Sequence, residues 1–129
     1  MAERNMNKNR PRHLALHLIK LPLPGIVSIL HRISGLMLFL ALPLLLSMLQ
    51  YSLRSIETYT ELMETLDYPL VKVALLGVLW AFLHHFCAGL RYLAVDLHWV
   101  GNLAQARTTG WIVMIAGVML TVWFGVKLW

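Results

Sequence analysis

Three uncharged apolar stretches restrict the fold of this chain more than any other feature of its sequence. They cover residues 33–51, 73–90 and 110–126, which are 19, 18 and 17 residues long. At about 1.5 Å per residue, a helix of each length spans roughly 26–29 Å, about the thickness of the hydrocarbon core of a bilayer. None of the stretches alternates between polar and apolar residues, so helices are favoured over a membrane β-barrel.

The composition agrees with a membrane location. Of the 129 residues, 59% are apolar and 13% are charged, whereas soluble domains carry about 25% charged residues. Disorder is excluded by the apolar content, and a disulfide scaffold is excluded because Cys87 is the only cysteine. We therefore predict an all-α integral membrane protein with three transmembrane helices. It forms one membrane-anchor domain, residues 1–129, with a basic arm and three spans, at residues 1–24, about 25–51, 69–95 and 110–129.

Basic residues predict the orientation of these spans. The chain has 11 Lys and Arg residues and a net charge of +5, and six of the basic residues precede Ile33. The connection between the second and third spans adds Arg91 and Arg107, whereas the first connection is rich in Glu and Asp. The positive-inside rule then places the N-terminus in the cytoplasm. Basic residues that flank a span in this way indicate a lipid surface, and no nucleic-acid partner is expected.

The N-terminal segment predicts the membrane in which the protein lies. Its first apolar run begins too late for a secretory signal, and it lacks the serines typical of a transit peptide. We therefore expect the bacterial inner (plasma) membrane, with the mitochondrial inner membrane as the alternative.

A first group of polar residues lies at the cytoplasmic edge of the first span. Ser28 and Arg32 are one helical turn apart and share a face, and His31 lies beside them. A charged residue at this depth is costly. Arg32 either extends its guanidinium to the lipid headgroups or, with Ser28 and His31, binds a polar group whose charge changes.

A second group of polar residues lies at the end of the second span. His85, Gly89, Tyr92 and Asp96 fall on one helical stripe. An intramembrane histidine is a candidate functional residue, and neutral imidazole is a common ligand for iron. Hydrogen bonding to another helix is the alternative. The adjacent His84 points about 100° away, so the two histidines cannot bind one metal from the same helix.

No motif in the chain indicates catalysis by its own side chains. The sequence has no phosphate-binding loop, no CxxC pair, no Ser-His-Asp pattern and no pair of carboxylates. A coupled transporter usually carries an acidic residue at mid-membrane, and the three apolar stretches have none. These observations predict no catalytic residues and weigh against a transporter.

Two motifs in this order resemble those of a known family, the cytochrome b membrane-anchor subunits of succinate dehydrogenase, respiratory complex II. The resemblance covers nearly the whole chain. The motifs are Arg10-Pro11 followed by Ser28-x-x-His31-Arg32-x-Ser34-Gly35, and then His85-x-x-x-Gly89-Leu90-Arg91-Tyr92 ending at Asp96.

The resemblance implies roles for five residues. His85 matches an axial ligand of haem b, whose second axial histidine comes from a second small anchor subunit. Ser28 and Arg32 match residues that line the ubiquinone site beside the iron–sulfur subunit. His31 and Tyr92 match positions near the haem propionates. Many members have a histidine where this chain has Tyr92, which can hydrogen-bond a propionate but carries no positive charge near neutral pH.

The resemblance also implies a function in electron transport and the tricarboxylic acid cycle. The chain would be a subunit of succinate:ubiquinone oxidoreductase and pass electrons from the iron–sulfur subunit to ubiquinone. Succinate itself would be oxidised on a flavoprotein subunit, not on this chain. The alternatives are the anchor subunit of a fumarate reductase and a non-redox small membrane protein, either a transporter or a scaffold.

Overall fold

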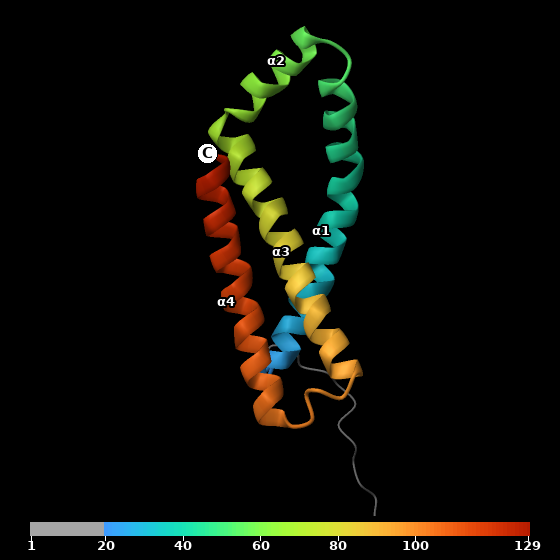
Figure 1. Cartoon of the computed structure of the whole chain (residues 1–129), viewed down its shortest axis with the longest axis vertical. Helices are drawn as coiled ribbons and strands as arrows, with labels where there is room; N and C mark the ends of the chain where they lie inside the picture. The colour runs from blue at the N-terminus through green and yellow to red at the C-terminus, as the bar shows by residue number, and fades with distance from the viewer. Residues whose placement is uncertain (1–19) are drawn as a thin grey trace, which may run out of the picture.

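The computed structural model describes residues 20–129, which form four helices and no strand within that range. The helices are α1 (Leu23–Ser52), α2 (Ile56–Leu66), α3 (Pro69–Asp96) and α4 (Leu103–Leu128) (Figure 1). Three of them, α1, α3 and α4, are long and apolar enough to cross a membrane. The predictions of an all-α chain and of three membrane-spanning helices are therefore confirmed. Most of the predicted basic arm, residues 1–19, lies outside the described part of the chain.

Local signals explain where the long helices begin. A proline occupies the first turn of both α1 and α3, where its missing N–H costs no hydrogen bond. α4 begins at Leu103 rather than near residue 110, because the side chain of Asn102 caps it. The Asn102 Oδ1 accepts a hydrogen bond from the Gln105 backbone N–H at 2.8 Å. The polar first turns of α4 therefore extend the helix beyond its apolar stretch.

The short helix α2 was not predicted from the sequence. It begins with a capping box in which Ser55 Oγ accepts from the Thr58 N–H at 3.2 Å and Thr58 Oγ1 accepts from the Ser55 N–H at 3.1 Å. The Tyr51 hydroxyl donates to Glu61 Oε2 at 2.5 Å and so ties α2 to the end of α1. The acidic residues of the first connection therefore lie on or beside a helix.

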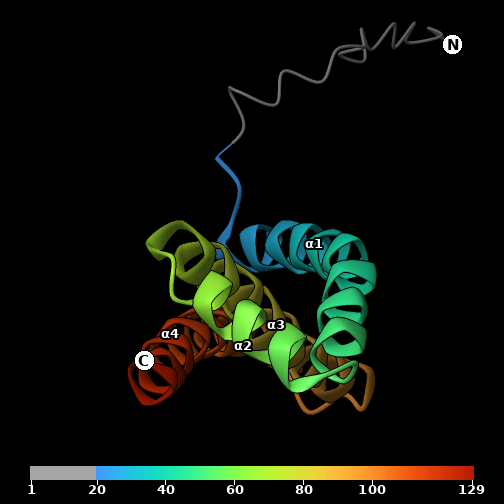
Figure 2. The same ribbon diagram turned by 90° about the horizontal axis from the view of Figure 1, so that it is seen from above.

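α3 packs against both α1 and α4, and the beginning of α1 also packs against α4 (Figures 1 and 2). The bundle has two different ends. α1 crosses α3 near the end of the bundle where α1 begins and α3 finishes, and we call this the closed end. Toward α2 the two helices separate, and we call that the open end. Few side chains are buried, and large apolar ones such as Phe39 remain 72% exposed. Three helices thus leave most apolar surface to lipid or to other subunits.

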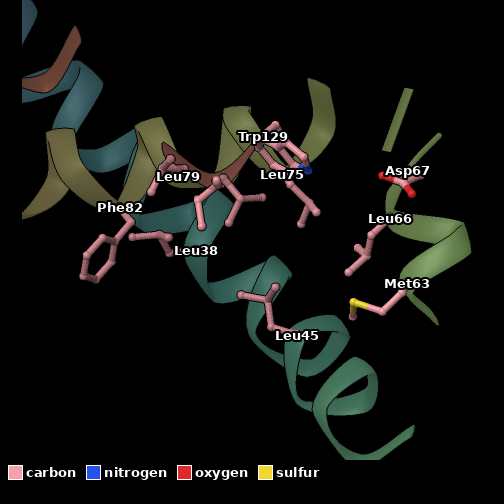
Figure 3. Close-up of a pocket in the computed structure, with 11 residues that line it drawn as sticks. Leu38, Leu45, Met63, Leu66, Asp67, Leu75, Leu79, Phe82 and Trp129 are labelled. Carbon is pink, nitrogen blue, oxygen red and sulfur yellow. The ribbon is translucent and has the colours of Figure 1, made fainter. Parts of the chain in front are cut away.

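The open end contains an apolar cavity of about 650 Å³ between α1, α2 and α3 (Figure 3). Leu45 of α1, Met63 of α2 and Leu75 of α3 line it, together with Trp129 from the C-terminus. Among the described residues that line the cavity, Asp67 alone is charged. The polar residues singled out by sequence lie instead at the closed end.

Arg91 ties α3 to α4 at the closed end. Its side chain is 8% exposed, its Nε donates to Thr109 Oγ1 at 3.1 Å, and its Nη2 donates to the Ala106 carbonyl at 3.2 Å. Its guanidinium carbon also lies 5.5 Å from the centre of the Tyr92 ring. Within residues 20–129 no carboxylate forms a salt bridge with Arg91. The positive charge of its guanidinium is therefore stabilised by the neutral oxygens of Thr109 and Ala106.

Replacing Arg91 with leucine is expected to destabilise the packing of α3 against α4. Two hydrogen bonds from a charged donor are lost, and Thr109 loses a buried partner, at a cost of about 1–3 kcal/mol. A thermal unfolding curve of the detergent-solubilised protein should show a lower Tm. The control is Arg107→Leu, because Arg107 is exposed on α4 and should leave the Tm unchanged. Equal Tm values for the two variants would contradict the role of Arg91.

Candidate functional site

Three of the residues singled out by sequence meet where α1 crosses α3. The His31 ring of α1 stacks on the His85 ring of α3, with centroids 4.1 Å apart and an interplanar angle of 11°. The Tyr92 ring lies 5.2 Å from the His31 ring at 54°. The stripe predicted on α3 therefore faces α1 at the closed end.

One nitrogen of His85 is hydrogen-bonded to α1. Its Nδ1 lies 3.1 Å from the His31 carbonyl oxygen and 3.3 Å from Ser34 Oγ. A carbonyl oxygen can only accept, so Nδ1 carries the hydrogen and donates it. This is the interhelical hydrogen bond that the sequence left open as an alternative, and it involves only one of the two ring nitrogens. No described residue hydrogen-bonds to Nε2, which keeps a lone pair available for a ligand.

The surroundings of His85 fit a flat group with acidic substituents. Gly89 lies one turn after His85 on α3, and an added Cβ there would meet only His31 Nε2, at 4.0 Å. The hydroxyl of Tyr92 is buried and has no hydrogen-bond partner among the described residues, and such a group costs free energy unless it is paired. A small residue thus gives access to the backbone, and a buried hydroxyl is free to hydrogen-bond a ligand.

Arg32 does not join this group of aromatic rings. It follows His31 on α1, so it points to another side of the helix, and its side chain is exposed. Within residues 20–129 its guanidinium makes no salt bridge. Ser28 lies one turn before Arg32 and is half-buried. The two side chains keep the shared helix face predicted from their spacing, and both remain available for a ligand from outside the chain.

His84 faces a different side of α3 from His85, as the step of about 100° between adjacent residues predicts, and it lies against α4. It is 1% exposed, stacks on Trp80 with ring centroids 5.2 Å apart, and packs against Gly117 of α4. Its Nε2 is buried without a hydrogen-bond partner in the described chain. Residues 20–129 contain no group of three or more His, Cys, Asp or Glu that could hold a metal ion.

Sequence reasoning missed the contribution of three residues. Ser34 and Gly35 were part of the first motif but received no role, although both contact His85. Arg91 also received no role, although it is buried between two helices. The pairing of two helices is not visible in the spacing along either one, so the motif itself was the only signal.

Comparison with known proteins gives consistent matches along the chain. The profile of the succinate dehydrogenase/fumarate reductase transmembrane subunit family matches residues 6–124. The succinate dehydrogenase cytochrome b556 subunit of Coxiella burnetii is 35% identical over 125 residues, which cover 96% of this chain and 100% of that protein. The cytochrome b556 subunit of Rickettsia conorii is 32% identical over 113 residues, 88% of each chain. The cytochrome b560 subunit of Reclinomonas americana is 32% identical over 123 residues, covering 91% of this chain and 85% of that protein.

Proposed function

The chain belongs to the succinate dehydrogenase/fumarate reductase transmembrane subunit family, and on this premise we propose that it helps bind haem b and forms part of the quinone-reduction site of a succinate:ubiquinone oxidoreductase. This membership confirms the family predicted from the two motifs, that of the cytochrome b anchor subunits of complex II. The three relatives described above are subunits of succinate dehydrogenases. They favour this function over a fumarate reductase anchor and over a non-redox membrane protein.

The observation that carries the proposal is the state of the His85 imidazole. Its Nδ1 donates to the His31 carbonyl at 3.1 Å, which leaves Nε2 as the nitrogen with a lone pair. A hydrogen bond of this kind orients an imidazole and makes it a stronger ligand for a metal. His85 would hold the haem iron, and the Tyr92 hydroxyl and His31 would hydrogen-bond the propionates. When bound, haem b supplies reversible one-electron storage.

The second axial ligand would come from a partner subunit. The His31 imidazole stacks nearly parallel on the His85 ring, with centroids 4.1 Å apart. Two stacked rings cannot bind an iron from opposite sides. The exposed apolar surface of the bundle supports contact with a second small anchor subunit. The iron–sulfur and flavoprotein subunits would bind at the closed end.

Ser28 and Arg32 would bind ubiquinone. The Ser28 hydroxyl can donate a hydrogen bond to a quinone carbonyl oxygen. The Arg32 guanidinium makes no salt bridge with a described residue, so its charge can stabilise the negative charge that develops as the quinone is reduced. Such electrostatic stabilisation is strongest where water is excluded. In this arrangement the chain positions the quinone, and succinate is oxidised on another subunit.

The distribution of charge supports a cytoplasmic closed end. Arg32, Arg91 and Arg107 lie toward that end, whereas the open end carries the acidic residues of the α1–α3 connection. Positive charge on the cytoplasmic side is the general rule for membrane proteins. The two bacterial relatives favour the bacterial inner membrane over the mitochondrial inner membrane.

Purification through an affinity tag on this chain tests the proposed function. In mild detergent, we expect mass spectrometry to identify a flavoprotein, an iron–sulfur protein and a second small membrane protein. The reduced-minus-oxidised absorption spectrum should show a b-type haem. A preparation without a flavoprotein would contradict the assembly, and one with a flavoprotein but without haem absorbance would contradict the proposed haem site.

A further inference from the structure

We infer that Ser34 and Gly35 of α1 are positioning residues for His85, which fix the plane of its imidazole and keep the hydrogen on Nδ1. The inference rests on the proposed function, in which Nε2 of His85 binds iron. It goes further than that function because it assigns the orientation of the His85 ring to residues of α1, whereas His85 itself belongs to α3. Two independent contacts support it, one steric and one polar.

The steric contact is the close approach of His85 to Gly35. A Cβ added at Gly35 would lie 2.9 Å from His85 Cε1 and 3.4 Å from His85 Nδ1. Non-bonded carbon atoms are most stable at about 3.5–4.0 Å, so even a methyl group would displace the ring. The imidazole therefore lies directly on the backbone of α1, and only glycine leaves room for it there.

The polar contact fixes which nitrogen carries the hydrogen. Ser34 is fully buried, and its Oγ donates to the His31 carbonyl at 2.9 Å. With its hydrogen used there, the hydroxyl presents lone pairs to Nδ1, 3.3 Å away. The second neighbour of Nδ1 is the His31 carbonyl, which can only accept. Nδ1 thus faces two acceptors, the Ser34 hydroxyl and this carbonyl, and no donor. Both acceptors favour the imidazole that has its hydrogen on Nδ1 and its lone pair on Nε2.

The stacked ring of His31 limits the movement of His85. Because the two rings lie 4.1 Å apart, His31 covers one face of the His85 imidazole. A methyl group at position 35 would press on the edge of the ring that contains Cε1. This steric clash can be relieved only if the His85 side chain rotates or if α1 moves away from α3. Either change moves Nε2 of His85.

Gly77 offers a matched control for Gly35. It lies inside α3, and a Cβ added there meets nothing within 4 Å. Alanine is favoured over glycine inside a helix by about 1 kcal/mol, and both substitutions gain this helix propensity. Only Gly35→Ala introduces the contact with His85, so a difference between the two variants reports that contact.

The decisive experiment compares Gly35→Ala with Gly77→Ala in the complete complex. The measured quantities are the haem-to-flavin ratio, the retention of haem during dilution and the reduced-minus-oxidised spectrum. We expect Gly35→Ala to retain haem about 10-fold less well, the lower range for loss of an outer contact to a metal ligand, and Gly77→Ala to match the unmodified complex. A Gly35→Ala complex with unchanged haem retention and spectrum would overturn the steric role.

Ser34→Ala gives a second test that does not depend on the fit at position 35. It removes one acceptor from Nδ1 but leaves the His31 carbonyl, so we expect haem to be retained with a shifted midpoint potential. An unchanged midpoint potential in Ser34→Ala would overturn the polar role. This test remains valid even if the Gly35→Ala complex fails to assemble. His85→Ala separates the two proposals. If His85→Ala keeps the haem, the proposed ligand is wrong, whereas loss of haem in His85→Ala with unchanged Gly35→Ala and Ser34→Ala complexes refutes only the positioning roles.

Discussion

Replacing His85 with alanine is expected to abolish the b-type haem absorbance of the purified complex. Among the described residues at the α1–α3 crossing, the substitution removes the one ring nitrogen that combines a lone pair with an orienting hydrogen bond on the other nitrogen. A methyl group cannot replace an imidazole as a ligand, so the proposed haem would lose the side chain that holds it on this chain. The reduced-minus-oxidised spectrum, normalised to flavin, measures the loss.

The neighbouring histidine provides the control for this experiment. His84 is 1% exposed and stacks on Trp80, so His84→Phe retains an aromatic ring of similar shape. It also removes an unpartnered buried nitrogen, which normally costs about 1–3 kcal/mol. We therefore expect His84→Phe to fold and to show the unmodified spectrum. Loss of haem in His84→Phe together with its retention in His85→Ala would make His84 the ligand and refute the assignment.

The main features of the fold could be predicted because each apolar stretch is long enough to cross a bilayer by itself. Where a backbone is surrounded by hydrocarbon, helix formation is imposed by the solvent and needs no knowledge of tertiary contacts. α2 lacks this constraint, because it has 11 residues and stands outside the apolar stretches. Its capping box pairs Ser55 with Thr58 where the usual sequence signature has Glu or Gln, so the standard signal for the start of a helix is missing here.

The candidate site could be predicted only one helix at a time. Spacing along the chain gave the stripe of His85, Gly89 and Tyr92, and it separated His84 from His85. It did not reveal that the stripe contacts Ser34 and Gly35, because the crossing point of two helices depends on how their surfaces pack. The burial of Arg91 between α3 and α4 was missed for the same reason.

The two candidate binding functions start from adjacent residues of α1. His31 turns toward α3 and stacks on His85, whereas Arg32 is exposed on another side of the helix. One helical turn of α1 would therefore contact both the haem and the quinone site. This arrangement predicts that substitutions at Arg32 affect quinone chemistry without removing the haem, which separates the two functions experimentally.

Replacing Arg32 with leucine is expected to lower succinate:quinone reductase activity about 10²- to 10³-fold, the usual effect of removing one electrostatic contact to a developing charge. Because Arg32 is exposed and makes no salt bridge with any residue of the described chain, its loss should not disturb the bundle. Assembly, the haem spectrum and dye-linked succinate oxidation should therefore remain at the level of the unmodified complex.

Two further variants separate charge from position in this experiment. Arg32→Lys keeps the positive charge and should restore part of the quinone reductase activity, although a lysine cannot reproduce the planar donors of a guanidinium. Arg107→Leu removes an exposed arginine of α4 and should leave the quinone reductase activity unchanged. If Arg32→Leu lowered assembly, dye-linked oxidation and quinone reduction equally, Arg32 would be a structural residue. A leucine that left quinone reduction intact would refute its part in binding ubiquinone, since no other fixed positive charge lies one turn from Ser28 on α1.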